Sequence, residues 1–114
     1  MTKYLLLYMS PVTPQDQMAN ASPEEGQAGM EAWNAWAGRA GSSLVDFGSP
    51  IASAGSVGAV NAGPESGGRF VGGFSIMEAE SADALRAMLE DHPHLMLDGA
   101  SISFFEFLEL PGGP

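Results

Sequence analysis

Both histidines of the chain lie in one short run, residues 90–99, which has the sequence EDHPHLMLDG. Asp91 and Asp98 lie on either side of His92 and His94. An imidazole exchanges a proton near neutral pH, because its ordinary pKa is about 6.5, and a neighbouring carboxylate can orient it. The same side chains also provide the N and O ligands that bind zinc and similar ions. This run is therefore where we first expect chemistry.

The residues of this run allow three interpretations. His92 and His94 flank Pro93, so an extended backbone would turn both rings to roughly the same side. A His-x-His pair without a third histidine is a weak metal signal, and we expect no metal and no cofactor. His94 is the candidate acid–base residue, with Asp98 as its candidate acidic partner. In the structural interpretation His94 hydrogen-bonds the connection into the last strand, while Asp91 and His92 face water.

Aromatic residues elsewhere in the chain are candidates for binding a substrate. Tyr8, Trp33 and Trp36 can line a pocket for an apolar or aromatic small molecule, although such residues at helical spacing more often form plain core. Arg69 precedes a predicted strand and follows a glycine-rich stretch, so its guanidinium either faces solvent or clamps an anion. We take these four residues as substrate-binding candidates.

The charge balance excludes several classes of partner. Four Lys and Arg residues oppose 14 Asp and Glu residues, giving a net charge of −10. Binding to nucleic acid or to anionic membranes needs clustered basic groups, so neither is expected. The apolar run of residues 4–9 is too short for a secretory or membrane segment. Cysteine is absent, which excludes thiol catalysis and is compatible with the cytoplasmic location that we expect.

The length of 114 residues fits one domain, which we expect at residues 1–110, followed by a flexible tail at 111–114. The hydrophobic pattern predicts four strands and two helices. The strands are expected at residues 4–9, 44–48, 69–77 and 101–110. The helices are expected at residues 23–40 and 82–91.

Local signals support these elements. Ser22, Pro23 and Glu25 form an N-cap, a first-turn proline and a capping box, and Ser81 caps the second helix. The core-facing stripe of the first helix is expected to be Met30, Trp33, Ala37 and Ala40. Residues 11–21 are expected to be a loop. Two glycines at 72–73 predict a bulge in the third strand, or a close approach of another group.

The order strand, helix, strand, strand, helix, strand is typical of an α+β, ferredoxin-like fold. In that fold a four-stranded antiparallel sheet carries both helices on one face. Large apolar residues then remain on the uncovered face, among them Phe105 and Phe107 or their neighbours. We therefore predict a homodimer that packs sheet against sheet.

Three stretches carry a family resemblance: KYLLLYM, GGFSIMEAESADALRAMLEDHPHL and HPHLMLDGASI. They resemble the opening strand, the third strand with the second helix, and the connection to the last strand of the YCII-related (DGPF-type) proteins. The resemblance spans residues 2–12 and 61–107. It implies a dimeric α–β barrel with a pocket between the sheet and the first helix, and an activity that is mostly uncharacterised. It also implies a His and Asp acid–base pair in some members. His94 matches the family's Pro-His-Leu position, whereas Asp98 is only the nearest acidic residue in sequence.

The chain also departs from that family. The signature Asp-Gly-Pro-Phe is replaced by the residues Ala62, Gly63, Pro64 and Glu65, and no histidine lies near the first strand. Two functions follow as hypotheses: an acid–base enzyme acting on a small organic molecule through His94, or a non-catalytic dimeric module that binds a small ligand or a protein. A monooxygenase-like relative of the same dimeric fold is a third possibility that no residue specifically favours.

Overall fold

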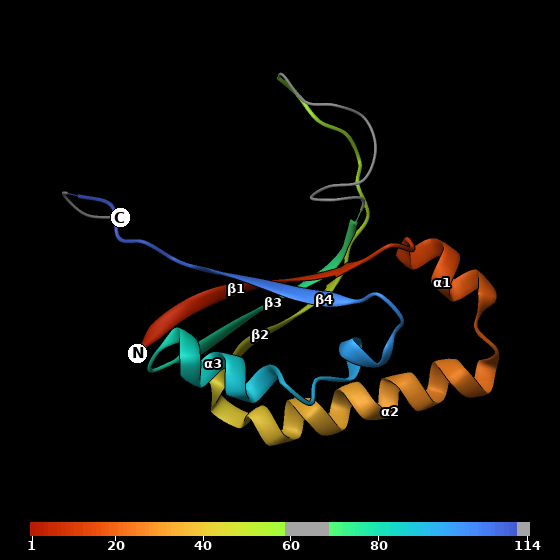
Figure 1. The fold of residues 1–114 in the computed structure, drawn as a ribbon, viewed down its shortest axis with the longest axis horizontal. Helices are drawn as coiled ribbons and strands as arrows, with labels where there is room; N and C mark the ends of the chain where they lie inside the picture. The colour runs from red at the N-terminus through yellow and green to blue at the C-terminus, as the bar shows by residue number, and fades with distance from the viewer. Residues whose placement is uncertain (59–68, 112–114) are drawn as a thin grey trace.

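The protein is built on one antiparallel sheet of four strands, in the order β2-β3-β1-β4, with α2 and α3 on the same side of it (Figure 1). A computed structural model describes residues 1–58 and 69–111. Its strands are β1 (Thr2–Ser10), β2 (Leu44–Pro50), β3 (Phe70–Ala79) and β4 (Ser101–Glu106). Its helices are α1 (Pro14–Asn20), α2 (Pro23–Ala40) and α3 (Ala82–Leu89), with short 3-10 turns η1 (Gly41–Ser43) and η2 (Pro93–Met96). The predicted ferredoxin-like fold is thus confirmed.

Helix α2 begins and ends where its local signals predict. The Ser22 hydroxyl accepts a hydrogen bond from the Glu25 amide at 3.1 Å, and the Glu25 carboxylate accepts one from the Ser22 amide at 2.9 Å. Gly41 ends the helix with a positive φ of 58°, which glycine adopts without a Cβ clash. The predicted stripe is wrong at Met30, which is 60% exposed. The helix instead buries Trp36, one turn after Trp33.

The segment expected as a loop at residues 11–21 contains helix α1. Thr13 is its N-cap, since the Thr13 hydroxyl accepts a hydrogen bond from the Asp16 amide at 3.2 Å. Pro14 occupies the first helical position. These are the same signals that mark the start of α2. The prediction of a loop was therefore wrong although the sequence contained the evidence.

The core lies between the sheet and the helices. Tyr4, Leu6 and Tyr8 of β1 alternate toward the helices and pack with Met77 of β3 and Leu85 of α3. The opposite face of the sheet is also apolar. Cross-strand register places Leu5, Leu7, Phe74, Ile76 and Phe105 on that face, where Phe105 is 54% exposed.

The predicted bulge in β3 is confirmed at Gly72. Tyr8 pairs with Gly73 and Met9 pairs with Val71, so Gly72 is the extra residue. A Cβ at Gly73 would lie 3.4 Å from the Tyr8 ring and 3.3 Å from the Ser49 carbonyl oxygen. The glycine thus allows Tyr8 to lie close against β3.

Some sequence-based expectations lie outside this description. The signature replacement at residues 62–65 and the end of the predicted tail, residues 112–114, are outside the described residues. Strand β4 ends at Glu106 rather than at residue 110. Within the described ranges, no helix has the length and apolar character needed to cross a membrane.

Candidate functional site

The chain bends sharply between α3 and β4, and this bend positions both histidines. Helix α3 ends at Leu89, and Pro93 starts η2 with His92 in extended geometry at its N-cap (φ −62°, ψ 134°). The prediction that His92 faces water was wrong, because its side chain is only 1% exposed. Proline defines where the helix ends, but the extended geometry at His92 turns its ring inward toward α2, as its contacts with Trp33 and Trp36 show. Asp91, in contrast, is exposed as predicted.

His94 joins the ends of two neighbouring strands. Its Nε2 lies 2.9 Å from the Met9 carbonyl oxygen of β1 and 3.1 Å from the Ser101 carbonyl oxygen of β4. Carbonyl oxygens only accept hydrogen bonds, so Nε2 carries the proton and Nδ1 is the basic nitrogen of the neutral ring. The predicted hydrogen bond into the last strand is therefore confirmed. Burial lowers the pKa of His94, and its two backbone hydrogen bonds oppose that shift.

Three aromatic side chains surround the two imidazoles, and we call these five residues the aromatic–histidine cluster. Trp33 lies edge-on to Tyr8, with ring centroids 4.9 Å apart, and edge-on to His92 at 4.6 Å. Trp36 lies 4.2 Å from His92, and Tyr8 lies 5.3 Å from His94. The cluster lies between the sheet and α2. It brings together the acid–base candidate and three of the four residues predicted to bind a substrate.

Tyr8 is held by a short chain of hydrogen bonds. Its hydroxyl donates to Ser75 Oγ at 2.8 Å, and Ser75 Oγ donates to the Phe47 carbonyl oxygen at 2.6 Å. Burial raises the pKa of Tyr8 to about 12, so the phenol remains protonated at neutral pH. None of the sequence-based predictions included Ser75. Its alternation with Met77 on β3 was the signal that it faces the helices.

His92 is neutral in this environment. Burial, and to a smaller extent the nearby His94, lower the pKa of His92 to about 4, although Asp91 acts in the opposite direction. Its Nε2 is buried and has no hydrogen-bond partner within the part of the chain that the structure describes. The cluster is therefore uncharged at neutral pH. No group of three or more His, Cys, Asp or Glu side chains among the described residues is arranged to hold a metal ion.

The two remaining candidates lie apart from the cluster. Asp98 is exposed, and no hydrogen bond or ion pair between described residues joins it to His94. Arg69 Nη1 donates to the Gly99 carbonyl oxygen and to Ser101 Oγ, the latter at 3.4 Å. Arg69 thus joins Gly99, in the loop before β4, to Ser101, the first residue of β4. The carbonyl oxygen of Ser101 also accepts from His94. These contacts of Arg69 lie outside the aromatic–histidine cluster.

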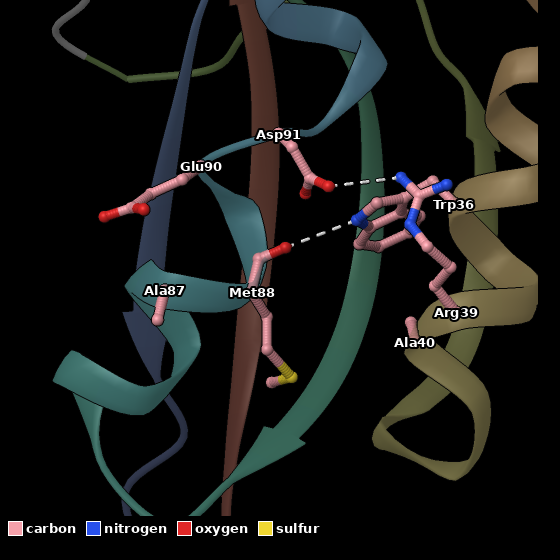
Figure 2. A pocket seen from close by; sticks show the side chains of 7 residues that line it. All are labelled: Trp36, Arg39, Ala40, Ala87, Met88, Glu90 and Asp91. Atoms are coloured by element: carbon pink, nitrogen blue, oxygen red, sulfur yellow. Dashed lines mark hydrogen bonds and ion pairs between the residues drawn. The ribbon is translucent and has the colours of Figure 1, made fainter.

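A cavity of about 440 Å³ opens between α2 and the end of α3 (Figure 2). Trp36 is the one member of the cluster that lines it, and its Nε1 donates to the Met88 carbonyl oxygen at 3.4 Å. Arg39 reaches from α2 to Asp91, with Nη2 and Oδ2 3.4 Å apart. Asp91 is therefore engaged with Arg39 rather than with a histidine.

Comparison with known proteins adds one structural likeness. No family model matches the chain, and no curated protein matches it. A solved structure of 5-chloro-2-hydroxyhydroquinone dehydrochlorinase from Burkholderia phenoliruptrix AC1100, in complex with 2,5-dihydroxybenzoquinone, is similar over 100% of both chains, with a TM-score of 0.56 and 18% sequence identity. The likeness is one of fold.

Proposed function

We propose that this protein is a YCII-related dimeric α–β barrel protein that acts as an acid–base enzyme on a small organic molecule through His94. The observation that carries the proposal is that His94 lies between the sheet and α2 with Tyr8 and Trp33 beside it, at ring-centroid distances of 5.3 and 6.4 Å. Trp36 lies in the same cluster, against His92. That is where the family resemblance implies a pocket. The fold likeness to a dehydrochlorinase solved with a hydroxybenzoquinone supports a planar, oxygen-bearing ring as the class of substrate.

The proposed chemistry uses the free nitrogen of His94. Because Nε2–H is occupied by two carbonyl oxygens, Nδ1 is the atom that takes a proton from a substrate hydroxyl or an activated carbon. The lowered pKa of His94 keeps the ring unprotonated at neutral pH, as a general base requires. The resulting imidazolium then returns the proton to the product or to water. Tyr8, which stays protonated, is a neutral member of the same site.

A second function is favoured by a specific observation. The two hydrogen bonds of His94 to Met9 and Ser101 also suit a purely structural residue, and no acidic side chain among the described residues contacts it. In this alternative the protein is a non-catalytic dimeric module that binds a small ligand or a protein. The two functions differ in whether the bound molecule is consumed.

The test is turnover of hydroxylated and chlorinated benzoquinones and hydroquinones, followed by absorbance. His94→Gln is the sharpest variant, since the glutamine amide can still donate to the Met9 and Ser101 carbonyls but lacks a basic nitrogen. We expect it to lower the rate by about 10²–10⁴-fold. Asp98→Asn, which alters a side chain without contact to His94, is expected to lower it by less than about 10-fold. Unchanged turnover in His94→Gln would refute the proposal, and binding without turnover by the unaltered protein would support the alternative.

Two further parts of the proposal concern assembly and location. We propose that the apolar sheet face with Leu5, Leu7 and Phe105 is covered by a second copy of the chain, which would form the barrel. The proposed location is the cytoplasm, with which the absence of cysteine is compatible.

A further inference from the structure

His92 caps the turn that carries His94. In the short helix η2 the amide of His94 lies in the first turn, where no carbonyl of the helix itself can accept from it. His92 Nδ1 accepts this hydrogen bond at 3.0 Å. Serine, threonine, aspartate and asparagine usually accept at this position with an oxygen atom. Here a ring nitrogen takes that role, so His92 must leave Nδ1 unprotonated and carry its proton on Nε2.

The rest of the His92 ring is enclosed by protein. Its side chain is 1% exposed and packs against Trp33 and Trp36 at centroid distances of 4.6 and 4.2 Å. Tyr8 lies 5.0 Å from it. A ring so enclosed meets no solvent and leaves no room for a substrate. Any effect of His92 on chemistry must therefore act through His94.

His94 is consequently fixed at both ends. Its backbone amide is bound by His92 Nδ1, and its ring Nε2 is bound by the carbonyl oxygens of Met9 and Ser101. We infer that His92 is a positioning residue, whose Nδ1 holds the His94 backbone so that the His94 ring keeps its proton on Nε2 and its Nδ1 free as the base. The inference deepens the proposed function, because positioning matters for catalysis only if His94 is the base.

A merely structural role for His92 makes a different prediction. If the ring only fills space in the core, any side chain of similar size serves equally well. If Nδ1 is required, the position of the acceptor atom decides the outcome. Asparagine places its amide oxygen close to the position of Nδ1, whereas glutamine places its amide group close to that of Nε2. His92→Asn and His92→Gln are therefore a matched pair.

The experiment is long-range ¹H–¹⁵N NMR of the imidazoles, which reports which ring nitrogen carries the proton. In the unaltered protein at neutral pH we expect both rings to have the proton on Nε2. His92→Asn is expected to keep the His94 ring in that form, with a titration midpoint within about 0.3 pH unit of the unaltered protein. In His92→Gln we expect a mixture of both forms at His94 and a midpoint raised by at least about 0.5 pH unit, since a loosened ring gains water.

Two results would overturn the inference. One is a proton on Nδ1 of His92 in the unaltered protein, because that nitrogen could not accept from the His94 amide. This measurement needs no variant and is independent of folding defects. The other is the same proton position and the same titration midpoint at His94 in both variants, whether altered or unaltered, with near-ultraviolet circular dichroism showing that both are folded. These spectra contain no substrate, so they test the positioning role of His92 separately from the turnover that the proposed function predicts. Either of the two can fail while the other holds.

Discussion

Two imidazoles only two positions apart have different chemistry because they use different nitrogens. His92 accepts with Nδ1 inside an aromatic enclosure, and His94 donates with Nε2 to two carbonyl oxygens. The sequence singled out His94, and the burial of His92 was missed. Pro93 predicts that the helix stops, which is a local property. The side toward which the His92 ring turns depends on where Trp33 and Trp36 of another helix lie, and no local pattern contains that information.

The buried neutral His92 makes the stability of the protein sensitive to acid. Its pKa is about 4 in the folded chain and about 6.5 when unfolded. Between these pH values the unfolded chain binds the proton and the folded chain does not, so stability rises with pH. The contribution is complete above about pH 6.5 and falls by about 3 kcal/mol as the pH decreases to about 4. Urea unfolding measured from pH 7 to pH 4 should show this loss.

The control for the acid effect is His92→Asn, which keeps an acceptor and removes the titrating ring. The lowered pKa of His94 acts in the same direction and remains in this variant. The difference in unfolding free energy between the two proteins therefore isolates His92. An identical pH dependence in both would contradict the account of His92 as a buried neutral imidazole.

Most of the secondary structure was predictable from local signals. The capping residues of α2 and the bulge at Gly72 are both found where the sequence indicates them. Helix α1 was missed although Thr13 and Pro14 repeat the start signal of α2, because its short polar sequence offers no apolar stripe. Arg69 and Met30 show the limit of such signals. The contacts of Arg69 and the exposure of Met30 depend on which elements meet in three dimensions.

Two glycine substitutions, one of them a matched control, test the pairing of β2 with β3. Gly48 has a φ of 79°, and a Cβ there would collide with the Phe74 carbonyl. We expect Gly48→Ala to lower the unfolding free energy by at least about 1 kcal/mol. Gly38, inside α2 with open space around it, is the control, and Gly38→Ala should raise the unfolding free energy by roughly 0.5–1 kcal/mol. Chemical denaturation of both variants checks the pair, and equal effects would contradict the register of β2.

At the scale of the whole molecule, the sheet has two apolar faces and the described helices cover one of them. The order of elements made this predictable, since four strands with two helices on one side leave the other side uncovered. Leu5, Ile76 and Phe105 form one row across three strands of that face. Such a surface is expected to pair with a second copy, because a contiguous apolar patch is costly in water.

Charge placed on this face should separate the proposed dimer. The chain has a mass of 11.8 kDa. We expect the unaltered protein to elute with twice that mass, and Phe105→Lys to elute with the mass of a single chain. Met96→Lys is the control, because Met96 is 84% exposed and lies in η2, outside the sheet. Size-exclusion chromatography with light scattering gives both masses. A monomer for the unaltered chain at micromolar concentration would contradict the proposed assembly.

The proposed function requires that a small organic molecule binds beside His94, which acts as its base. The most direct test follows the imidazole NMR signals of His94 while 2,5-dihydroxybenzoquinone and related hydroxylated rings are added. We predict that His94 titrates below the ordinary imidazole value when no ligand is present, and that at least one such ring shifts its signals and its titration midpoint. A His94 that titrates near the ordinary value of about 6.5 and is unaffected by every ligand of the panel would contradict the claim.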